Sequence, residues 1–131
     1  MASTPDDLKY TKDHEWVRVE GDSARIGITD HAQRQLGDVV YVELPKVDDR
    51  VEAAEPFGSV ESVKAVTEVL APLGGTVAEI NEGLNDEPES VNTDPYGDGW
   101  MIRLTLSDTS QLTGLLTAAQ YEDYVKDESG D

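Results

Sequence analysis

One lysine, Lys64, lies among valines, serines and an alanine in the stretch GSVESVKAV, in a chain that contains few lysines. Valines recur there every third residue, out of step with the two-residue period of a single strand. We therefore expect a turn between two strands near Ser62 to Ala65, with Lys64 at or beside the tip. A lysine in a β-rich segment is most often a solvated side chain on an outward face. An exposed amine at a hairpin tip is also open to acylation by another enzyme, and nothing in the stretch indicates the desolvated setting of a Schiff-base lysine.

The other residues that could do chemistry give weaker signals. His14-Glu15 resembles the start of the zinc-binding pattern HExxH, but its second histidine is missing, and His31 is the only other histidine. Asp94 and Asp98 flank a glycine in a pattern typical of a tight turn rather than a calcium loop. The sequence has no GxGxxG or GxSxG motif, and it has no cysteine for a disulfide, a thiolate metal site or a nucleophile. These residues predict neither a metal site nor a catalytic site.

Short strands between turn signals must position these residues. Alternating apolar residues around Gly21-Asp22 predict a hairpin. A helix is expected over 31–36, capped by Thr29 or Asp30 and ended by Gly37. A short helix is expected after Asp108 or Ser110. Another is expected from 118, where Thr117 and Gln120 form a capping box. Further strands are expected at 38–44, around 50–62, and at 65–72, 75–81 and 100–106. Core or sheet-edge packing is expected for four aromatic residues: Trp16, Tyr41, Tyr96 and Trp100.

This spacing of short strands favours a small β-sandwich or barrel. A faint repeat, Gly37–Val39–Val42 against Gly75–Val77–Ile80, suits two similar half-sheets packed face to face. The 131 residues are enough for one domain with a modest core. We expect a single domain over 1–131, with its core at about 8–125 and a mobile acidic tail at 126–131.

The composition argues against several classes of partner. There are 28 acidic and 10 basic residues, for a formal net charge of -18, so the surface repels nucleic acid phosphates and anionic lipid. No apolar run approaches the length of a membrane span. The first residues lack a signal or transit pattern, so a cytoplasmic location is expected. Adaptation to a salty cytoplasm is one hypothesis for the acidic surface.

The stretch GSVESVKAV closely resembles the lipoyl-attachment hairpin of the glycine cleavage system H protein family. The resemblance extends, in order and spacing, to YTKDHEWV, IGITDHAQRQLGDVVYVELP, NEGLNDEPESVNTDPYGDGWMIRL and LLTAAQYEDYV. It covers the chain from about Leu8 to about Val125. The combination of ESVKA with DPYGDGW separates the chain from general lipoyl domains, which carry Asp-Lys-Ala at the tip, and from biotinyl domains, which carry Met-Lys-Met.

The resemblance implies a carrier and not an enzyme. Its fold would be the flattened β-barrel, or hybrid-motif sandwich, of lipoyl domains, mainly β with short peripheral and C-terminal helices. A lipoate ligase or lipoyl transferase would join lipoic acid to Lys64 through an amide, reading the hairpin residues Glu61, Ser62, Val63 and Ala65. The carrier would shuttle the aminomethyl group of glycine between a pyridoxal-phosphate glycine decarboxylase, an aminomethyltransferase that uses tetrahydrofolate, and a dihydrolipoamide dehydrogenase that uses FAD.

The resemblance also implies a surface cleft into which the loaded arm folds back. The matching positions are Asp13 and Glu15 on one side, with Gln35 and Glu68 opposite. Carboxylates there would hold a cationic amine by charge-assisted hydrogen bonds. Some relatives have a histidine in place of Gln35. Since the chain carries so many carboxylates, each of these acids is nearly as well explained as part of the solvated surface.

Three alternatives stay open from the sequence. One is a lipoyl carrier of the same fold that serves lipoate relay or another pathway. Another is an enzyme whose hydrolytic site is formed by His14, Glu15 and His31, which would have to converge in one pocket. The last is an unmodified adaptor whose hairpin docks a partner.

Overall fold

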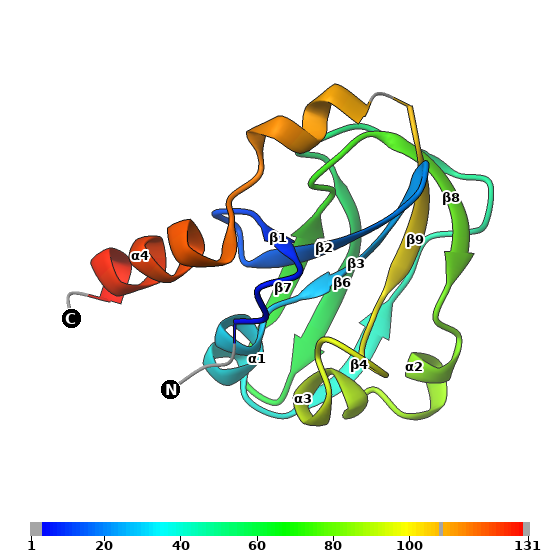
Figure 1. The fold of residues 1–131 in the computed structure, drawn as a ribbon. Helices are drawn as coiled ribbons and strands as arrows, with labels where there is room; N and C mark the ends of the chain where they lie inside the picture. The colour runs from blue at the N-terminus through cyan, green and yellow to red at the C-terminus, as the bar shows by residue number, and fades with distance from the viewer. Residues whose placement is uncertain (1–3, 108, 130–131) are drawn as a thin grey trace.

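Two antiparallel β-sheets packed against each other form the body of the protein (Figure 1). The computed structural model describes residues 4–107 and 109–129. One sheet has six strands in the order β1-β2-β3-β9-β8-β5, and the other has three in the order β4-β6-β7. The strand bounds are β1 Lys9–Tyr10, β2 Glu15–Glu20, β3 Ser23–Ile28, β4 Val39–Glu43, β5 Arg50–Val51, β6 Pro56–Ser62, β7 Val66–Leu70, β8 Gly75–Ile80 and β9 Ile102–Leu106.

The helices are short and lie at the margins of the sheets (Figure 1). Their bounds are α1 Asp30–Leu36, α2 Gly83–Asp86, α3 Ser90–Thr93, the 3-10 helix η1 Thr109–Gly114 and α4 Ala118–Ser129. The predicted β-sandwich with peripheral and C-terminal helices is confirmed. None of the described helices combines the length and the hydropathy that crossing a bilayer requires.

The main core fills the space between the two sheets. Val17 and Ile26 of the larger sheet and Val42, Val60 and Val69 of the smaller sheet belong to one buried cluster. Burial of each such side chain contributes about 1.5–3 kcal/mol, so this cluster fixes one sheet on the other. The half-sheet prediction is correct in placing the repeated segments, now β4 and β8, in opposite sheets, but it is wrong about similar sheets, since one has six strands and the other three.

Both of the longer helices begin as their capping residues predict. Thr29 accepts a hydrogen bond from the Ala32 amide at the start of α1, and Gly37 ends that helix with a φ of 79°. Before α4, the Thr117 amide donates to Gln120 Oε1 (3.0 Å), and the Gln120 amide donates to Thr117 Oγ1 (3.2 Å). Asp108, which together with Ser110 was proposed to open a short helix, lies outside the described residues.

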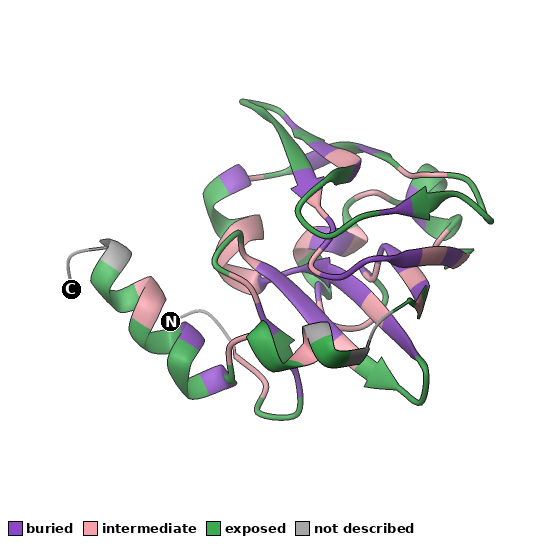
Figure 2. Cartoon of the chain, turned by 90° about the horizontal axis from the view of Figure 1, so that it is seen from above, coloured by how far each residue is buried: buried purple, intermediate pink, exposed green. Residues whose placement is uncertain are grey.

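Helix α4 is attached to the body through its first two turns. Tyr121 stacks on Tyr10 with ring centroids 4.8 Å apart, within a second buried cluster that includes Leu8, Trp16 and Ala118. Figure 2 shows the buried positions of α4 near its start, while its other positions up to 127 are exposed or intermediate. The helix continues to Ser129, so 126–129 of the expected tail are helical, and 130–131 lie outside the described residues.

Four features differ from the sequence predictions. The single strand expected around 50–62 is two strands, β5 and β6, which lie in different sheets. The edge strand β1 and the four-residue helices α2 and α3 were not predicted. Of the aromatic residues expected in the core or at a sheet edge, Trp16 is fully buried, and Tyr41, on the edge strand β4, is 52% exposed.

Candidate functional site

Strands β6 and β7 form a hairpin whose tip carries Lys64. The hairpin is paired from Pro56 opposite Leu70 to Glu61 opposite Val66, which leaves residues 63–65 in the turn. Val60 and Val69, one on each strand, are buried in the core. The predicted turn near Ser62 to Ala65 is therefore confirmed, and the tip stands on a base held by the packing of both strands.

The Ser62 side chain organises the turn. The backbone amide of Ser62 donates to the Ala65 carbonyl (2.8 Å). The Ser62 hydroxyl oxygen accepts from the amides of Ala65 (3.1 Å) and Lys64 (3.3 Å). Ser62 is only 6% exposed, so these bonds are shielded from water. A serine hydroxyl that satisfies amides two and three residues ahead fixes a tight turn without glycine.

A further hydrogen bond attaches the tip to the start of β4. The Val63 amide donates to the Asp38 carbonyl at 3.1 Å. Nearby, a Cβ built on Gly37 would lie 3.7 Å from Cε of Lys64, so the aliphatic part of that lysine passes close to the backbone after α1. The tip is therefore held on the α1–β4 connection as well as by its own strands.

Lys64 itself is exposed, as expected from its place at the tip. Across residues 4–107 and 109–129, no ion pair joins its ammonium group to a carboxylate. The other four lysines, Lys9, Lys12, Lys46 and Lys126, are exposed too. Exposure alone does not distinguish Lys64; its place on a rigid hairpin tip does.

A cavity of about 260 Å³ lies beside the hairpin. It is bounded by the tip and β7, by α1, and by the turn that precedes β2. All four residues predicted to form the cleft, together with Ala65 of the tip, line it: Asp13, Glu15, Gln35 and Glu68. The structure thus brings together residues separated by more than fifty positions in the sequence, next to the tip that carries the lysine.

Glu15 is the buried member of this group, with 3% of its surface exposed. Thr11 Oγ1 donates to its Oε1 at 2.7 Å, and the Leu70 amide lies 3.4 Å from its Oε2. Burial raises the pKa of Glu15 from 4.5 to about 7; the Thr11 hydrogen bond opposes this, and the charge of Asp13 adds to it. The carboxyl group therefore changes its charge near neutral pH.

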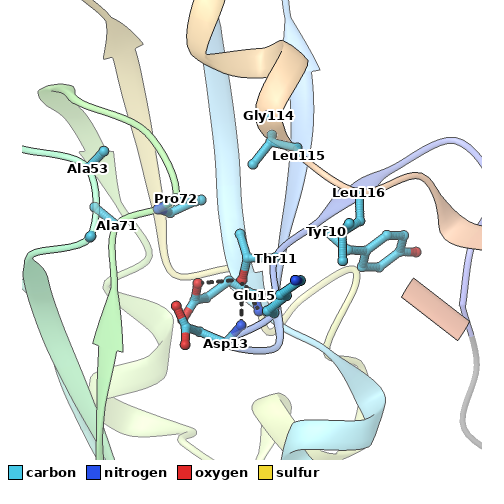
Figure 3. A pocket seen from close by; sticks show the side chains of 12 residues that line it. Tyr10, Thr11, Asp13, Glu15, Ala53, Ala71, Pro72, Gly114, Leu115 and Leu116 are labelled. Atoms are coloured by element: carbon cyan, nitrogen blue, oxygen red, sulfur yellow. Dashed lines mark hydrogen bonds between the residues drawn. The ribbon is translucent and has the colours of Figure 1, made fainter. Parts of the chain in front are cut away.

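Figure 3 shows the turn that positions this carboxylate. Thr11 Oγ1 also accepts from the amides of Asp13 and Glu15, each at 3.2 Å. His14, between them, has a φ of 68°, in the left-handed region that non-glycine residues rarely adopt. A second cavity of about 260 Å³, the one drawn in Figure 3, shares the lining residues Asp13 and Glu15 with the cleft. Sequence reasoning missed Thr11, because its role depends on the conformation of this turn.

His14 lines the cleft beside Glu15, and its ring lies next to that of His31. The rings of His14 and His31 are 4.7 Å apart, and His14 Nδ1 lies 2.8 Å from the Tyr121 hydroxyl, which in turn contacts Thr29 Oγ1 at 2.8 Å. Glu15 instead contacts Thr11 and Leu70. His31 does not line the cleft, and the described residues include no group of three or more acidic or histidine side chains that could hold a metal ion. The hydrolytic alternative requires His14, Glu15 and His31 to converge in one pocket, and only His14 and Glu15 line the cleft.

Comparison with known proteins gives one consistent result. The family described as Glycine cleavage H-protein matches residues 8–128. A glycine cleavage system H protein from Geobacillus kaustophilus is 62% identical over 120 residues, covering 92% of this chain and 94% of that protein. One from Herpetosiphon aurantiacus is 57% identical over 129 residues and covers 98% of each. The crystal structure of the glycine cleavage system H protein from Mycobacterium marinum matches with a TM-score of 0.83 at 39% identity, covering 97% of this chain and 99% of that one.

Proposed function

The chain belongs to the glycine cleavage H-protein family, and we propose that Lys64 is the residue through which it carries lipoic acid. Proteins of this family are the lipoyl carriers of the glycine cleavage system, so the chain is a carrier of the aminomethyl group of glycine and not a catalyst. The alternatives of a lipoate relay, a hydrolytic enzyme and an unmodified adaptor are not favoured. The observation that carries the assignment of Lys64 is its exposed position at the tip of a braced hairpin, next to a cleft.

The residues around Lys64 fit a covalently attached arm. The tip is fixed by Ser62 and by the bond from Val63 to Asp38, so the lysine is presented in a constant position while its side chain stays free to move. Lipoic acid supplies a disulfide that undergoes reduction and reoxidation, chemistry for which a chain without cysteine has no side chain of its own. Attachment to one lysine also raises the local concentration of the arm at each enzyme that docks the carrier.

The cleft fits the cationic end of a loaded arm. Asp13, Glu15 and Glu68 place carboxyl groups around it, and Gln35 adds an amide. Each carboxylate would accept charge-assisted hydrogen bonds from an ammonium group, and the partly enclosed cavity would limit access of water to that amine. Glu15 contributes most when ionised, which by its pKa of about 7 is the state above neutral pH.

The chain works with the enzymes of the glycine cleavage system. In detail, we propose visits to a pyridoxal-phosphate glycine decarboxylase, a tetrahydrofolate-dependent aminomethyltransferase and an FAD-dependent dihydrolipoamide dehydrogenase, after modification by a lipoate ligase or lipoyl transferase. A cytoplasmic location stays a prediction, to be checked by cell fractionation.

Reconstituted glycine cleavage tests the role of Lys64. Lys64→Arg keeps the charge and the fold, because the exposed tip residue buries little surface, but it has no primary amine for an amide. We expect no transfer of carbon from glycine to tetrahydrofolate with this variant and full transfer with Lys46→Arg, which changes another exposed lysine. Partial transfer with Lys64→Arg would contradict the proposal.

A further inference from the structure

An unusual apolar surface lies around Lys64. Six large apolar side chains of the described residues are exposed, and two of them, Val19 and Val47, lie on other segments. The other four lie on β4 and around the β6–β7 turn, and we call them the tip patch: Val40, Tyr41, Val63 and Val66. Their exposed fractions run from 48% to 70%. Exposed apolar side chains that gather on one face of a charged surface typically mark an interaction site.

Strand pairing places the tip patch on the outer face of the three-stranded sheet. Tyr41 lies opposite Glu61, and Glu61 lies opposite Val66, so the three side chains form one row across β4, β6 and β7. The adjacent pair, Val42 opposite Val60, points inward and is fully buried. Val40 stands at an irregularity in the β4–β6 register. The row therefore faces solvent at the strand pair next to the turn that carries Lys64.

Acidic residues adjoin the tip patch. Glu61 lies in the row between Tyr41 and Val66, and Glu43, opposite Ser59, lies in the next row on the same face. Lys64 is the only cation in residues 38–43 and 56–70. A surface that complements this one has apolar side chains at its centre and lysine or arginine around them.

We propose that the tip patch is the docking surface for the enzyme that acylates Lys64, an inference that rests on the function proposed above. In that reaction the deprotonated Nζ attacks the carbonyl carbon of an activated lipoate, such as a lipoyl adenylate. A C–N bond forms, the bond to the activating group breaks with its electron pair leaving on that group, and the amine proton passes to solvent or a base. The acylating enzyme must bring this carbonyl to Nζ itself, so it covers the residues that flank the tip.

The other enzymes of the system have no such requirement. They act at the far end of a long flexible arm, so their active sites need not approach the backbone of the tip. The geometry therefore assigns the tip patch to acylation in particular. Because the patch lies mainly on β4 and β7 and not in the turn, recognition extends beyond the sequence next to the lysine.

The test compares initial rates of acylation. The double variant Tyr41→Thr/Val66→Thr removes the two apolar members of the row and keeps residues that favour strands. Its matched control is Val19→Thr/Val47→Thr, at sites that are 44% and 50% exposed. Each protein is mixed with a lipoate ligase, lipoate and MgATP over a range of carrier concentrations, and product is measured by intact mass. Thermal unfolding checks that both variants fold.

We expect kcat/KM for acylation of the patch variant to fall by on the order of tenfold, mostly through KM, and that of the control variant to match the unmodified sequence. Once fully lipoylated by prolonged reaction, the patch variant should support carbon transfer at the usual rate. Equal acylation kinetics in the two variants would overturn the inference, as would unchanged acylation with impaired carbon transfer, which would move the patch to another enzyme. A dimer of the unmodified protein that the patch variant abolishes would assign the surface to a second copy. If the unmodified protein is not acylated at Lys64 at all, the proposed function fails as well.

Discussion

The buried carboxyl group of Glu15 gives a prediction that depends on pH. Because the pKa of this group is about 7 in the folded chain and 4.5 in its ordinary state, folding favours its protonated form. Its contribution to stability is fully present below pH 4.5, falls as the pH rises, and is lost above pH 7. The difference between the two pKa values corresponds to about 3 kcal/mol. Glu15→Gln replaces the carboxyl group by a neutral group of the same shape, and Gln Oε1 still accepts the Thr11 hydroxyl.

Urea unfolding from pH 4 to pH 8 measures this effect. The free energy of unfolding of Glu15→Gln, relative to that of the unmodified protein, should rise by about 3 kcal/mol over this range. At pH 4 the variant should be no more stable than the unmodified protein, since both carry a neutral group. High salt throughout reduces the general repulsion that accompanies a net charge of -18.

The control is Glu68→Gln, which removes one negative charge from an exposed position of the same cleft. Burial of Glu15 accounts for the part of the Glu15→Gln change in unfolding free energy that exceeds the Glu68→Gln change. A difference between the unmodified protein and Glu15→Gln that does not change with pH, or that equals the Glu68→Gln difference at every pH, would refute the claim that burial sets the pKa of Glu15.

Three further predictions concern the tip, the core and the surface. Ser62→Ala leaves the amides of Lys64 and Ala65 without their acceptor, so it should cost about 1–2 kcal/mol and speed hydrogen exchange at Ala65; unchanged exchange would contradict the role of the hydroxyl. Gly27→Ala puts a Cβ 2.8 Å from Nε1 of the buried Trp16 and should lower the free energy of unfolding in urea by about 1–3 kcal/mol. Gly114→Ala, with open space around it, should leave that free energy unchanged. Equal effects of the two substitutions would count against tight packing at Trp16. The urea midpoint should rise between roughly 0.1 and 1 M NaCl as the acidic surface is screened, and a flat response would argue against self-repulsion.

Local patterns in the sequence were enough for several elements of the site. The valine spacing located the hairpin turn, and the Thr29–Gly37 and Thr117–Gln120 signals located the starts of α1 and α4. Each of these depends on residues within a few positions of each other, which is the range over which capping and periodicity act. The tip that carries Lys64 was therefore predictable from its own segment.

Features set by distant contacts were not predictable in this way. The break between β5 and β6 occurs at Ala54, which has a φ of 70° and donates its amide to the Ala71 carbonyl at 2.7 Å; without a glycine there, the sequence gives no turn signal. Helix α3 carries Asn92, whose side chain donates to the Gly37 carbonyl and accepts from the Val39 amide, both at 2.8 Å. These bonds connect segments more than fifty residues apart.

The cleft, too, could be predicted only in part. Resemblance to a family placed Asp13, Glu15, Gln35 and Glu68 together, whereas composition alone left each of them a solvated acid or amide. The burial of Glu15, and with it the raised pKa, follows from the Thr11 turn and from the packing of β7 and cannot be read from residue types. The sequence left Tyr41 as a core or sheet-edge residue, and only the structure shows it half exposed on the edge strand β4, where it belongs to the tip patch.

Peptide mapping after lipoylation tests the attachment of lipoic acid to Lys64 most directly. The unmodified protein is incubated with a lipoate ligase, lipoate and MgATP, digested, and examined by mass spectrometry beside a lipoyl domain that the same ligase modifies. We predict one lipoyl group per chain, on the peptide that contains Lys64, and none on the peptides that contain Lys9, Lys12, Lys46 or Lys126. A lipoyl group on any of those four lysines, or none on the chain while the comparison domain is modified, would contradict the account.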